Sequence, residues 1–407
     1  MVVLRLLSAY DSRYAREMFA RCCAWSTLLL IAMACEGRPS THRKLNVRAS
    51  SAATRAPLTT QPALLASASP LASGNGSLDA GAPSGDLVHC KALGKRGLVS
   101  IAQFQEDLVD MTPEFDHVLV LTFHPGLGRV TLTRVRRDGS SKDVVSRQSG
   151  VGEPKPPTWA PDAVYFTRQR NLYRMPLAGG ESVLVAKGFS YSVAVGGGYA
   201  YGVTCDAKKS FDSLVRVAVG GGNLEPFADI EHTKPAEQDP GTFVCNYGSL
   251  VVDDKAVYLT HWNGRRVLRV DLESRATTSL AIKASYPSDL YLEDANLLFR
   301  ASGGVYRTSK TEANAVRVTN LGSAPFTMVA YDSKALFTHE SDPYATEECT
   351  YEVSSVTGKA NKRDCFKAER PDEFPPDVGV RGIAVDDECI YTMRKHQKYT
   401  ALYARSR

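Results

Sequence analysis

The feature of this 407-residue chain that most limits its fold is a repeat of about 40 residues in the part that follows residue 96. Each copy has an alternating apolar segment, a tight acidic or glycine-rich turn, and a second segment that carries an aromatic residue. Six copies are recognisable, at 156–167, 192–203, 249–260, 288–299, 327–338 and 382–393. Short alternating segments between turns indicate β-strands, and this period is typical of a β-propeller with four-stranded blades.

The copies predict an all-β propeller with seven blades, and a six-bladed ring with irregular ends is the alternative. Two further strands, at 117–123 and 129–139, belong to the first blade. The last copy has room for only three strands before the chain ends at Arg407. The segment 96–104 precedes the first blade without a sheet of its own, so we expect it to supply the outer strand of the last blade. Closure of this kind removes exposed sheet edges.

The third segment of four copies places an Arg after an apolar residue, at Arg174, Arg216, Arg269 and Arg307. This succession of aromatic-Thr, apolar-Arg and Pro-Leu-Xaa-Gly-Gly resembles the YWTD propellers of low-density-lipoprotein receptors and their bacterial relatives, over about residues 97–407. The nearest matches to Tyr-Trp-Thr-Asp are residues 165–167 and 258–260. The resemblance implies the fold and no particular activity. We expect each Arg stem to pack on its own blade with the charged head in water.

The acidic pairs Asp253-Asp254 and Asp386-Asp387 lie in the tight turns of two copies. Asp is favoured in such turns because its side chain accepts hydrogen bonds from nearby backbone amides. We therefore interpret these pairs as turn residues and not as paired catalytic carboxylates.

The N-terminal segment has the pattern of a secretory signal. An apolar run of 13 residues at 22–34 follows Arg13, Arg16 and Arg21, and it is shorter than the roughly 20 residues that span a bilayer. The run ends in Ala-Met-Ala before Cys35, which resembles the lipobox of bacterial lipoproteins. The resemblance implies cleavage before Cys35 and lipid attachment to its thiol; the alternative is cleavage after Ala34 and a secreted protein.

The residues that follow predict a tether, which gives three regions: a lipoprotein-type signal peptide at 1–35, a disordered tether at 36–87 and a propeller at 88–407. The tether contains no Phe, Tyr, Trp or Cys, and 32 of its 52 residues are Ala, Ser, Thr, Pro or Gly. Such a composition cannot bury enough apolar surface to offset the entropy of ordering. Met18 is an alternative start of the chain. We expect a cell-envelope protein, held in the outer membrane by its lipid and monomeric.

Six cysteines remain beyond the leader and Cys35, and six allow 15 pairings. The expected blade positions select one set of disulfides, which is Cys205–Cys245, Cys349–Cys365 and Cys90–Cys389. The last of these would clamp the ring by closing a loop of about 300 residues. The alternative is a set of free core thiols. No Cys-x-x-Cys or Cys/His spacing indicates zinc.

The long insertions fall on one predicted face. In a propeller, the loops between second and third strands and between blades share a face, and the insertions 204–212, 232–248, 339–348 and 366–380 all belong to it. The second strands also end there in four histidines and a tryptophan, which are His124, His261, Trp262, His339 and His396. We interpret this face as the candidate binding surface for a protein, peptide or glycan. The alternative interpretation is that these loops are exposed to solvent and collect polar residues without forming a binding site.

We therefore expect an exported binding module rather than an enzyme. The alternative is a propeller hydrolase or lyase, similar to the lactonases, with a metal-assisted site at the channel mouth; Asp289 and Asn246 are the polar first-strand residues that could serve it. A structural or sensory envelope module is a third hypothesis. No phosphate loop, nucleophile elbow or His-Glu-x-x-His motif occurs, so no catalytic residue, metal ligand or cofactor is assigned. The net charge of +5, part of it in the leader, is too small to predict nucleic-acid binding.

Overall fold

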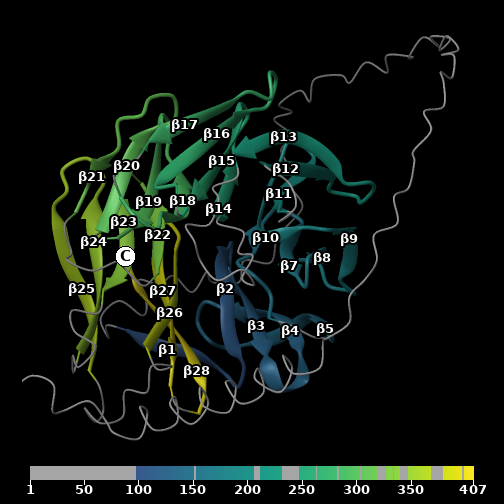
Figure 1. The fold of residues 1–407 in the computed structure, drawn as a ribbon. Helices are drawn as coiled ribbons and strands as arrows, with labels where there is room; N and C mark the ends of the chain where they lie inside the picture. Colours follow the sequence, from purple (N-terminus) through teal and green to yellow (C-terminus); the bar gives the residue numbers. More distant parts are fainter. Residues whose placement is uncertain are drawn as a thin grey trace, which may run out of the picture. The chain divides into compact units, whose positions relative to one another are not determined.

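The computed structural model describes residues 98–150, 153–205, 211–231, 247–262, 264–281, 284–302, 304–319, 327–332, 334–339, 347–367, 379–396 and 398–407. These residues form 28 strands and one short 3-10 helix, η2 (Pro125–Leu127). The strands make seven four-stranded antiparallel sheets around a central axis (Figure 1). The seven-bladed β-propeller predicted from the repeat is therefore confirmed. Within the described residues, no helix has the length and apolar character needed to cross a membrane.

The four strands of each blade are given from the innermost to the outermost. Blade 1 has β2 (Asp107–Glu114), β3 (His117–His124), β4 (Arg129–Arg136) and β5 (Lys142–Gln148). Blade 2 has β6 (Thr158–Trp159), β7 (Ala163–Arg168), β8 (Asn171–Pro176) and β9 (Val183–Lys187), and blade 3 has β10 (Ser190–Gly196), β11 (Tyr199–Thr204), β12 (Phe211–Ala218) and β13 (Glu225–Glu231). Blades 4 and 5 are β14 (Tyr247–Val252), β15 (Ala256–His261), β16 (Arg266–Asp271), β17 (Thr277–Ala281); β18 (Ser288–Leu292), β19 (Asn296–Ala301), β20 (Gly304–Ser309) and β21 (Val316–Arg317). Blades 6 and 7 are β22 (Met328–Tyr331), β23 (Lys334–His339), β24 (Glu347–Ser354), β25 (Ala360–Lys367); β26 (Gly379–Val385), β27 (Cys389–Lys395), β28 (Thr400–Ser406) and β1 (Val99–Phe104).

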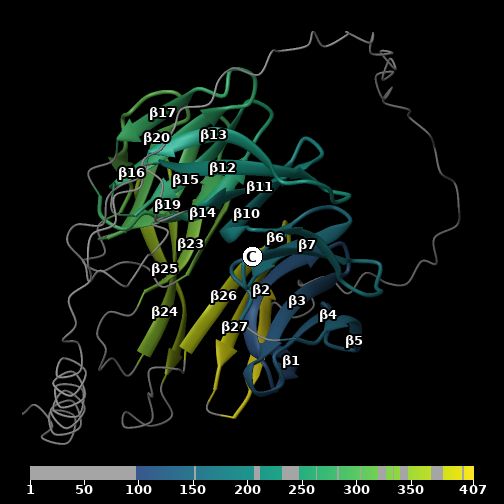
Figure 2. The same cartoon turned by 45° about the vertical axis from the view of Figure 1, so that its right-hand side comes forward.

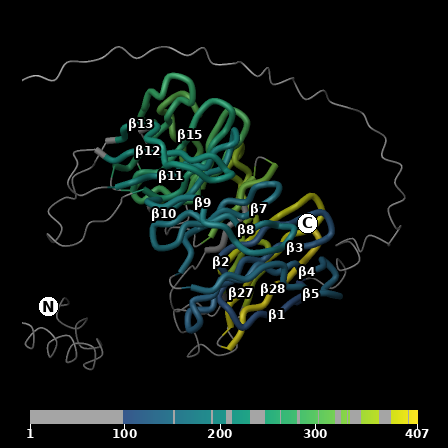
Figure 3. The backbone as a smooth tube through the Cα atoms, turned by 90° about the vertical axis from the view of Figure 1, so that its right-hand side faces the viewer, coloured from purple at the N-terminus to yellow at the C-terminus, as the bar shows by residue number. Residues whose placement is uncertain are grey.

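The ring closes as predicted, with the first strand of the chain completing the last blade. β1 pairs antiparallel with β28, from Val99 opposite Ala404 to Phe104 opposite Thr400, and the two strands lie side by side in Figures 1 and 3. β1 contributes the buried side chains Ile101 and Phe104 to the core between blades 7 and 1. The innermost strands of those blades, β26 and β2, are neighbours (Figure 2).

The repeating aromatic residue of the second strand packs between adjacent blades. Tyr165, Tyr201, Tyr258 and Tyr391 are almost fully buried, and each belongs to a cluster that includes residues of the next blade. Tyr391 of blade 7, for example, shares its cluster with Met111, Val118 and Val120 of blade 1. The period in the sequence therefore reflects the apolar contact that each blade makes with the next.

The first acid of each Asp-Asp turn joins one blade to the next. Asp253 pairs with Lys310 of blade 5 at 3.1 Å, and Asp386 pairs with Arg137 of blade 1 at 2.8 Å. In both turns the Oδ1 atom of the same Asp accepts two backbone N–H groups, as the turn prediction requires. We call the Asp386–Arg137 pair the closing latch, because it bridges the last blade and the first.

The repeating Arg residues combine solvent exposure at their heads with contacts inside their own blades. The Arg216 guanidinium lies over the Tyr199 ring of its own blade, with 4.4 Å from the guanidinium carbon to the ring centroid. The heads stay partly exposed, as expected, and also form ion pairs within the blade. The four pairs are Arg174–Asp162, Arg216–Glu225, Arg269–Asp271 and Arg307–Glu293, with N···O distances from 2.6 to 3.2 Å.

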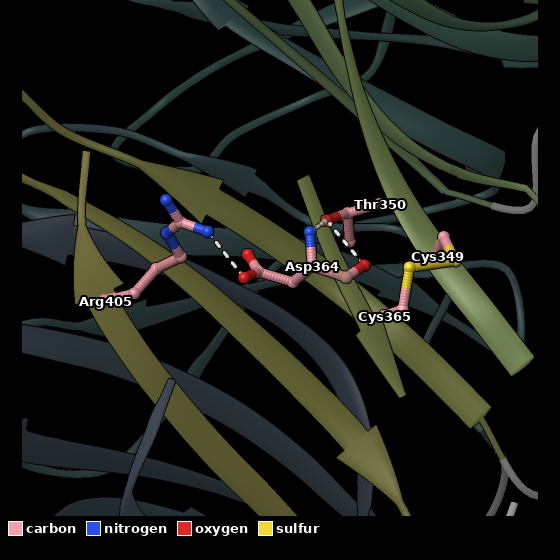
Figure 4. The surroundings of a disulfide bond; sticks show 5 residues. All are labelled: Cys349, Thr350, Asp364, Cys365 and Arg405. Carbon is pink, nitrogen blue, oxygen red and sulfur yellow. Dashed lines mark hydrogen bonds and ion pairs between the residues drawn. A yellow bond between two sulfur atoms is a disulfide. The ribbon is translucent and has the colours of Figure 1, made fainter. Parts of the chain in front are cut away.

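The disulfide predicted between Cys349 and Cys365 is present. The two residues are directly opposite on β24 and β25, with Cα atoms 4.1 Å apart (Figure 4). The neighbouring Asp364 pairs with Arg405 of β28, which connects blade 6 to blade 7. Cys205 and Cys389 are also disulfide-bonded, and their predicted partners Cys245 and Cys90 lie outside the described residues. The signal peptide, Cys35 and the tether lie outside them too, and these assignments stay predictions.

Candidate functional site

The two ends of the propeller differ in the connections that they carry. The turns between first and second and between third and fourth strands lie at one end, which we call the compact face. The other end, which we call the loop-bearing mouth, is where the second strands finish and the innermost strands begin. The strands that flank the four insertions end at this mouth, and most residues of the insertions themselves lie outside the described part of the chain.

The structure places the predicted histidines at the mouth but gives the described ones local partners. His124 caps η2 by accepting a hydrogen bond from the Leu127 amide at 3.2 Å. His396 stacks on Tyr399 and its Nε2 atom lies 3.0 Å from the Tyr403 hydroxyl. These imidazoles belong to blades 1 and 7 and support local structure.

His261 differs from the exposed binding residue that we expected. It is 1% exposed, it stacks on Tyr247, and Arg266 donates to its Nδ1 atom at 3.4 Å. Tyr247 of β14 and Arg266 of β16 therefore cover this imidazole from within its own blade. The side chain of His339 lies outside the described part of the chain.

Trp262 follows His261 and packs against an innermost strand. A Cβ atom on Gly248 would lie 2.4 Å from its indole Nε1 atom, so only glycine allows this approach. Gly248 lies in a register break of β14, between Tyr247 and Leu250. The indole therefore marks the edge of the channel in blade 4.

Register breaks recur at this level of the channel. Five innermost strands shift register within their first few residues: β2, β10, β14, β18 and β26. A β-bulge bends a strand and re-aims its side chains, and bulges are frequent beside functional sites. All five breaks lie at the loop-bearing mouth, because each innermost strand begins there. Register also shifts in the outer pairs of five blades, so the particular effect of the inner breaks is to change the direction of first-strand side chains at the mouth.

Two carboxylates approach each other across the channel at this level. Asp110 is on β2 of blade 1 and Asp289 is on β18 of blade 5, which are not neighbouring blades, and the two carboxyl groups interact electrostatically. The Trp159 indole of blade 2 donates to Asp110 Oδ2 at 2.9 Å. Burial raises the pKa of Asp110 to about 6, against the opposing hydrogen bond from Trp159 and with a further increase from Asp289.

Asp289 has a basic partner and a special backbone conformation. Its φ of +45° is unusual for a residue other than glycine, and it places the carboxylate 2.8 Å from Arg300 at the end of β19. Burial raises the pKa of Asp289, and the Arg300 guanidinium partly offsets this. Tyr291 lies beside both acids and donates to the Met328 carbonyl of blade 6. Burial and the two nearby carboxylates raise its pKa well above the ordinary range. We call Asp110, Trp159, Asp289, Tyr291 and Arg300 the channel cluster.

Two buried arginines at the ends of second strands pack on aromatic rings outside the innermost strands. Arg168 on β7 is 4% exposed and lies over the Tyr173 ring of β8, and Arg394 on β27 is 9% exposed with its guanidinium over the Phe366 ring of β25 at 4.8 Å. No three His, Cys, Asp or Glu side chains of the described residues lie close enough together to hold a metal ion.

The sequence pointed to Asp289 but not to the rest of the channel cluster. Asp110 and Trp159 are in the first two blades, where the repeat is weakest: β6 has two residues, and the sequence pattern did not define β2. Asp110 and Tyr291 are separated by 181 positions and interact only because the ring brings blades 1 and 5 face to face. A polar residue inside a first strand was the signal that could have found Asp110.

The comparisons with known proteins agree on the fold. No protein-family model and no curated protein sequence matches the chain. Its structure is similar to the RRP9 WD40 repeats, at a TM-score of 0.52 and 8% identity, covering 77% of this chain and 98% of that chain. It is also similar to the extracellular domain of the putative one component system BT4673 from B. thetaiotaomicron, at a TM-score of 0.50 and 10% identity, covering 75% of this chain and 42% of that chain.

A third similar structure is the AfRom2 CNH domain, at a TM-score of 0.50 and 10% identity, covering 76% of this chain and 99% of that chain. A nidogen/laminin complex matches at a TM-score of 0.43 and 13% identity, covering 63% of this chain and 94% of that chain. At these identities the likeness shows the β-propeller fold alone and does not assign the chain to the YWTD family.

Proposed function

We propose that this chain is an exported, lipid-anchored β-propeller that binds an envelope or extracellular protein, peptide or glycan at its loop-bearing mouth. The observation that carries the proposal is the register break that five innermost strands share at that mouth. A rigid scaffold with irregular strands and long connections at one end is the usual arrangement of a recognition surface. The compact face has short turns that are used for contacts between blades.

The chemistry of the mouth favours a polar ligand. Asp110 and Asp289 lie on innermost strands, and Arg300 pairs with Asp289 at 2.8 Å, so both signs of charge occur in the channel cluster. The Trp159 indole, which donates to Asp110, supplies aromatic surface beside them. Such a mixture suits protein and glycan ligands, whose surfaces combine hydrogen-bonding and apolar groups.

Recognition at the mouth is tested by affinity capture from envelope extracts with the full chain. Asp110→Asn removes a charge from the channel cluster, and Asp254→Asn removes one from an exposed turn of the compact face as the matched control. We expect Asp110→Asn, or replacement of 340–346 by a Gly-Ser linker, to reduce capture of a partner while Asp254→Asn retains it. Equal capture by all variants would contradict a binding site at the mouth.

The anchor is tested separately by fractionation of cells that produce the chain. We expect Cys35→Ser to move the protein from the membrane pellet to the soluble fraction, because the thiol that takes the lipid is lost. Cys22→Ser, within the apolar run, is the matched control and should leave the protein in the pellet. A Cys35→Ser protein that stays in the pellet would contradict lipidation.

A second candidate function rests on the pKa of Asp110. A carboxyl group that titrates near pH 6 beside a second carboxylate is suited to general acid–base catalysis. It favours a propeller hydrolase or lyase, similar to the lactonases, that works at the channel mouth. The metal-assisted version has less support, because no three His, Cys, Asp or Glu side chains of the described residues lie close enough together to hold a metal ion.

The enzyme is tested with a panel of lactones, esters and polyuronates. Turnover that follows an ionisation near pH 6 and disappears in Asp110→Asn would support it. Absence of turnover from about pH 5 to 8 would leave binding as the function of the mouth.

A further inference from the structure

A surface cavity of about 400 Å³ lies between blades 5 and 6, at the compact face and away from the loop-bearing mouth. Its volume is within the range of roughly 300–1,000 Å³ that is typical of small-molecule sites. One wall comes from β19, β20 and β21 of blade 5, and the other comes from the turn 355–358 between β24 and β25 of blade 6. β21 has only two residues, so the outer edge of blade 5 leaves this space uncovered.

Arg307 lines the cavity, and its surroundings differ from those of the repeating arginine in other blades. In blades 2, 3 and 4 this arginine lies directly opposite a second-strand tyrosine, and the tyrosine hydroxyl interacts with the guanidinium. The pairs are Arg174–Tyr165, Arg216–Tyr201 and Arg269–Tyr258. Arg307 lies opposite Leu298 instead, because the aromatic Phe299 is displaced by one position and faces Tyr306. Blade 5 therefore keeps the arginine of the repeat without the hydroxyl group that engages it elsewhere.

The guanidinium of Arg307 consequently has hydrogen-bond donors to spare. Its Nε atom donates to Glu293 at 3.2 Å, and its side chain is 34% exposed. Within the described part of the chain, its terminal Nη1 and Nη2 atoms make no hydrogen bond, and neither does the side-chain amide of Asn296. Both residues line the cavity, so groups that can donate to a ligand are present on this wall.

The register of blade 5 directs these two side chains toward blade 6. Arg307 is opposite Leu298 of β19 and Val316 of β21, and Asn296 is two residues from Leu298. These side chains therefore share one face of the sheet. Leu298 belongs to the same apolar cluster as Met328 of blade 6, so this is the face that meets the neighbouring blade.

The charges of the cavity favour an anion of low charge. Its lining includes two arginines, Arg307 and Arg317, and no carboxylate. Glu293 neutralises one of these positive charges through its ion pair with Arg307. Glu312 lies outside the lining, in an exposed turn. The positive surplus is therefore small, and it suits a single carboxylate better than a multiply charged phosphate.

Apolar surface faces the same space from both walls. Val316 is 65% exposed on blade 5 and Val356 is 70% exposed on blade 6, and both line the cavity. A guanidinium with two terminal N–H groups can bind both oxygens of a carboxylate. We propose that this cavity binds a small organic acid, whose carboxylate contacts Arg307 and whose apolar body lies between Val316 and Val356.

The proposal is tested with the full chain in detergent and a matched pair of probes, para-fluorobenzoate and para-fluorobenzamide, which share a ring and differ in charge. Fluorine NMR titration measures the dissociation constants, and inorganic phosphate and unlabelled benzoate serve as competitors. Arg307→Lys keeps a positive charge beside Glu293 but removes the paired terminal N–H groups. Arg174→Lys makes the same change at the equivalent position of blade 2 and is the matched control.

A second pair of variants tests the opposite wall. Val356→Asp adds a negative charge at an exposed turn residue, so folding should be unaffected. Val183→Asp makes the same change at a valine that is 54% exposed on blade 2. We expect Arg307→Lys and Val356→Asp each to weaken the binding of para-fluorobenzoate by about fivefold or more, and the two controls to leave it unchanged.

Four results would overturn the proposal: no binding of para-fluorobenzoate up to roughly 10 mM, equal binding of para-fluorobenzamide, equal affinities in the variants and their controls, or displacement of the probe by phosphate at lower concentrations than by benzoate. None of these results bears on the loop-bearing mouth, which the variants leave intact.

Discussion

Removal of the closing latch is the sharpest test of how the ring is held together. In Asp386→Ala, the two backbone amides of Glu388 and Cys389 lose the Oδ1 acceptor at 2.8 and 2.7 Å. Arg137 at 2.8 Å and the Tyr391 hydroxyl at 3.1 Å lose the Oδ2 acceptor. One substitution therefore leaves a guanidinium of blade 1 without its nearest acid.

The magnitude follows from burial. The side chains of Arg137 and Asp386 are 16% and 15% exposed, so water screens the pair only in part. Loss of one partner of a buried pair destabilises a protein by about 3–5 kcal/mol, and a neutral hydrogen bond contributes about 1 kcal/mol. Allowing for partial screening, we expect Asp386→Ala to lower the free energy of unfolding by about 3–4 kcal/mol. The adjacent Asp387 is exposed, and Asp387→Ala should change that free energy by less than about 0.5 kcal/mol.

Urea denaturation of the full chain, followed by tryptophan fluorescence, measures both free energies by linear extrapolation. A double-mutant cycle with Arg137→Met isolates the contribution of the pair, which should be at least about 1 kcal/mol. Equal losses in Asp386→Ala and Asp387→Ala, or a coupling energy near zero, would refute the reasoning. Either result would mean that blade 7 is held to blade 1 without an energetic contribution from the latch.

Three further predictions concern the channel, the closing strand and the disulfide. Burial raises the pKa of Asp110 from 3.8 to about 6, so the contribution of the protonated carboxyl to stability is complete below about pH 3.8 and is lost as the pH rises through about 6. Asp110→Asn should therefore raise the free energy of unfolding by up to about 3 kcal/mol at about pH 8 and by little near pH 4, as measured by urea titration. A variant that is less stable than the original protein at pH 8 would contradict this prediction. Phe104→Ala should lower the free energy of unfolding by about 3–5 kcal/mol because the ring is 4% exposed, whereas Phe115→Ala, at 77% exposed, should leave it within about 0.5 kcal/mol. Replacement of Cys349 and Cys365 by Ser should lower the free energy of unfolding by about 3 kcal/mol relative to the oxidised protein, because the disulfide closes a loop with a sequence separation of 16. Unchanged stability would contradict an entropic contribution from the disulfide.

The sequence was sufficient for the blades because each blade repeats one local pattern. Tyr165 and Tyr258 recur beside turn residues, and each reports a contact with the next blade that is repeated around the ring. Even the closing strand could be predicted, because the last copy lacked a fourth strand and 96–104 had no other sheet. Packing that repeats between neighbouring blades produces a repeat in the amino-acid sequence, so it can be recognised there.

The channel cluster could not be predicted in the same way. Asp110 and Asp289 meet across the axis, and no spacing in the sequence states which blades face each other. The register breaks depend on the fit of seven strands around one axis, which is a property of the whole ring. His261 illustrates the same limit: a histidine at the end of a strand was expected to be exposed, and its neighbours Tyr247 and Arg266 on the adjacent strands cover it.

The pairing of β1 with β28 also sets the order of events when the chain is made. The segment Val99–Phe104 is synthesised near the start of the propeller, and its partner Thr400–Ser406 is the last strand to be synthesised. Thr400 donates to the Glu106 carbonyl across 294 positions of sequence. Six blades can assemble before Thr400–Ser406 has been made, but the seventh stays incomplete until that strand is available. Pairing of β1 with β28 is therefore the last step in assembly of the ring, and a nascent chain that stops before residue 400 has an open ring.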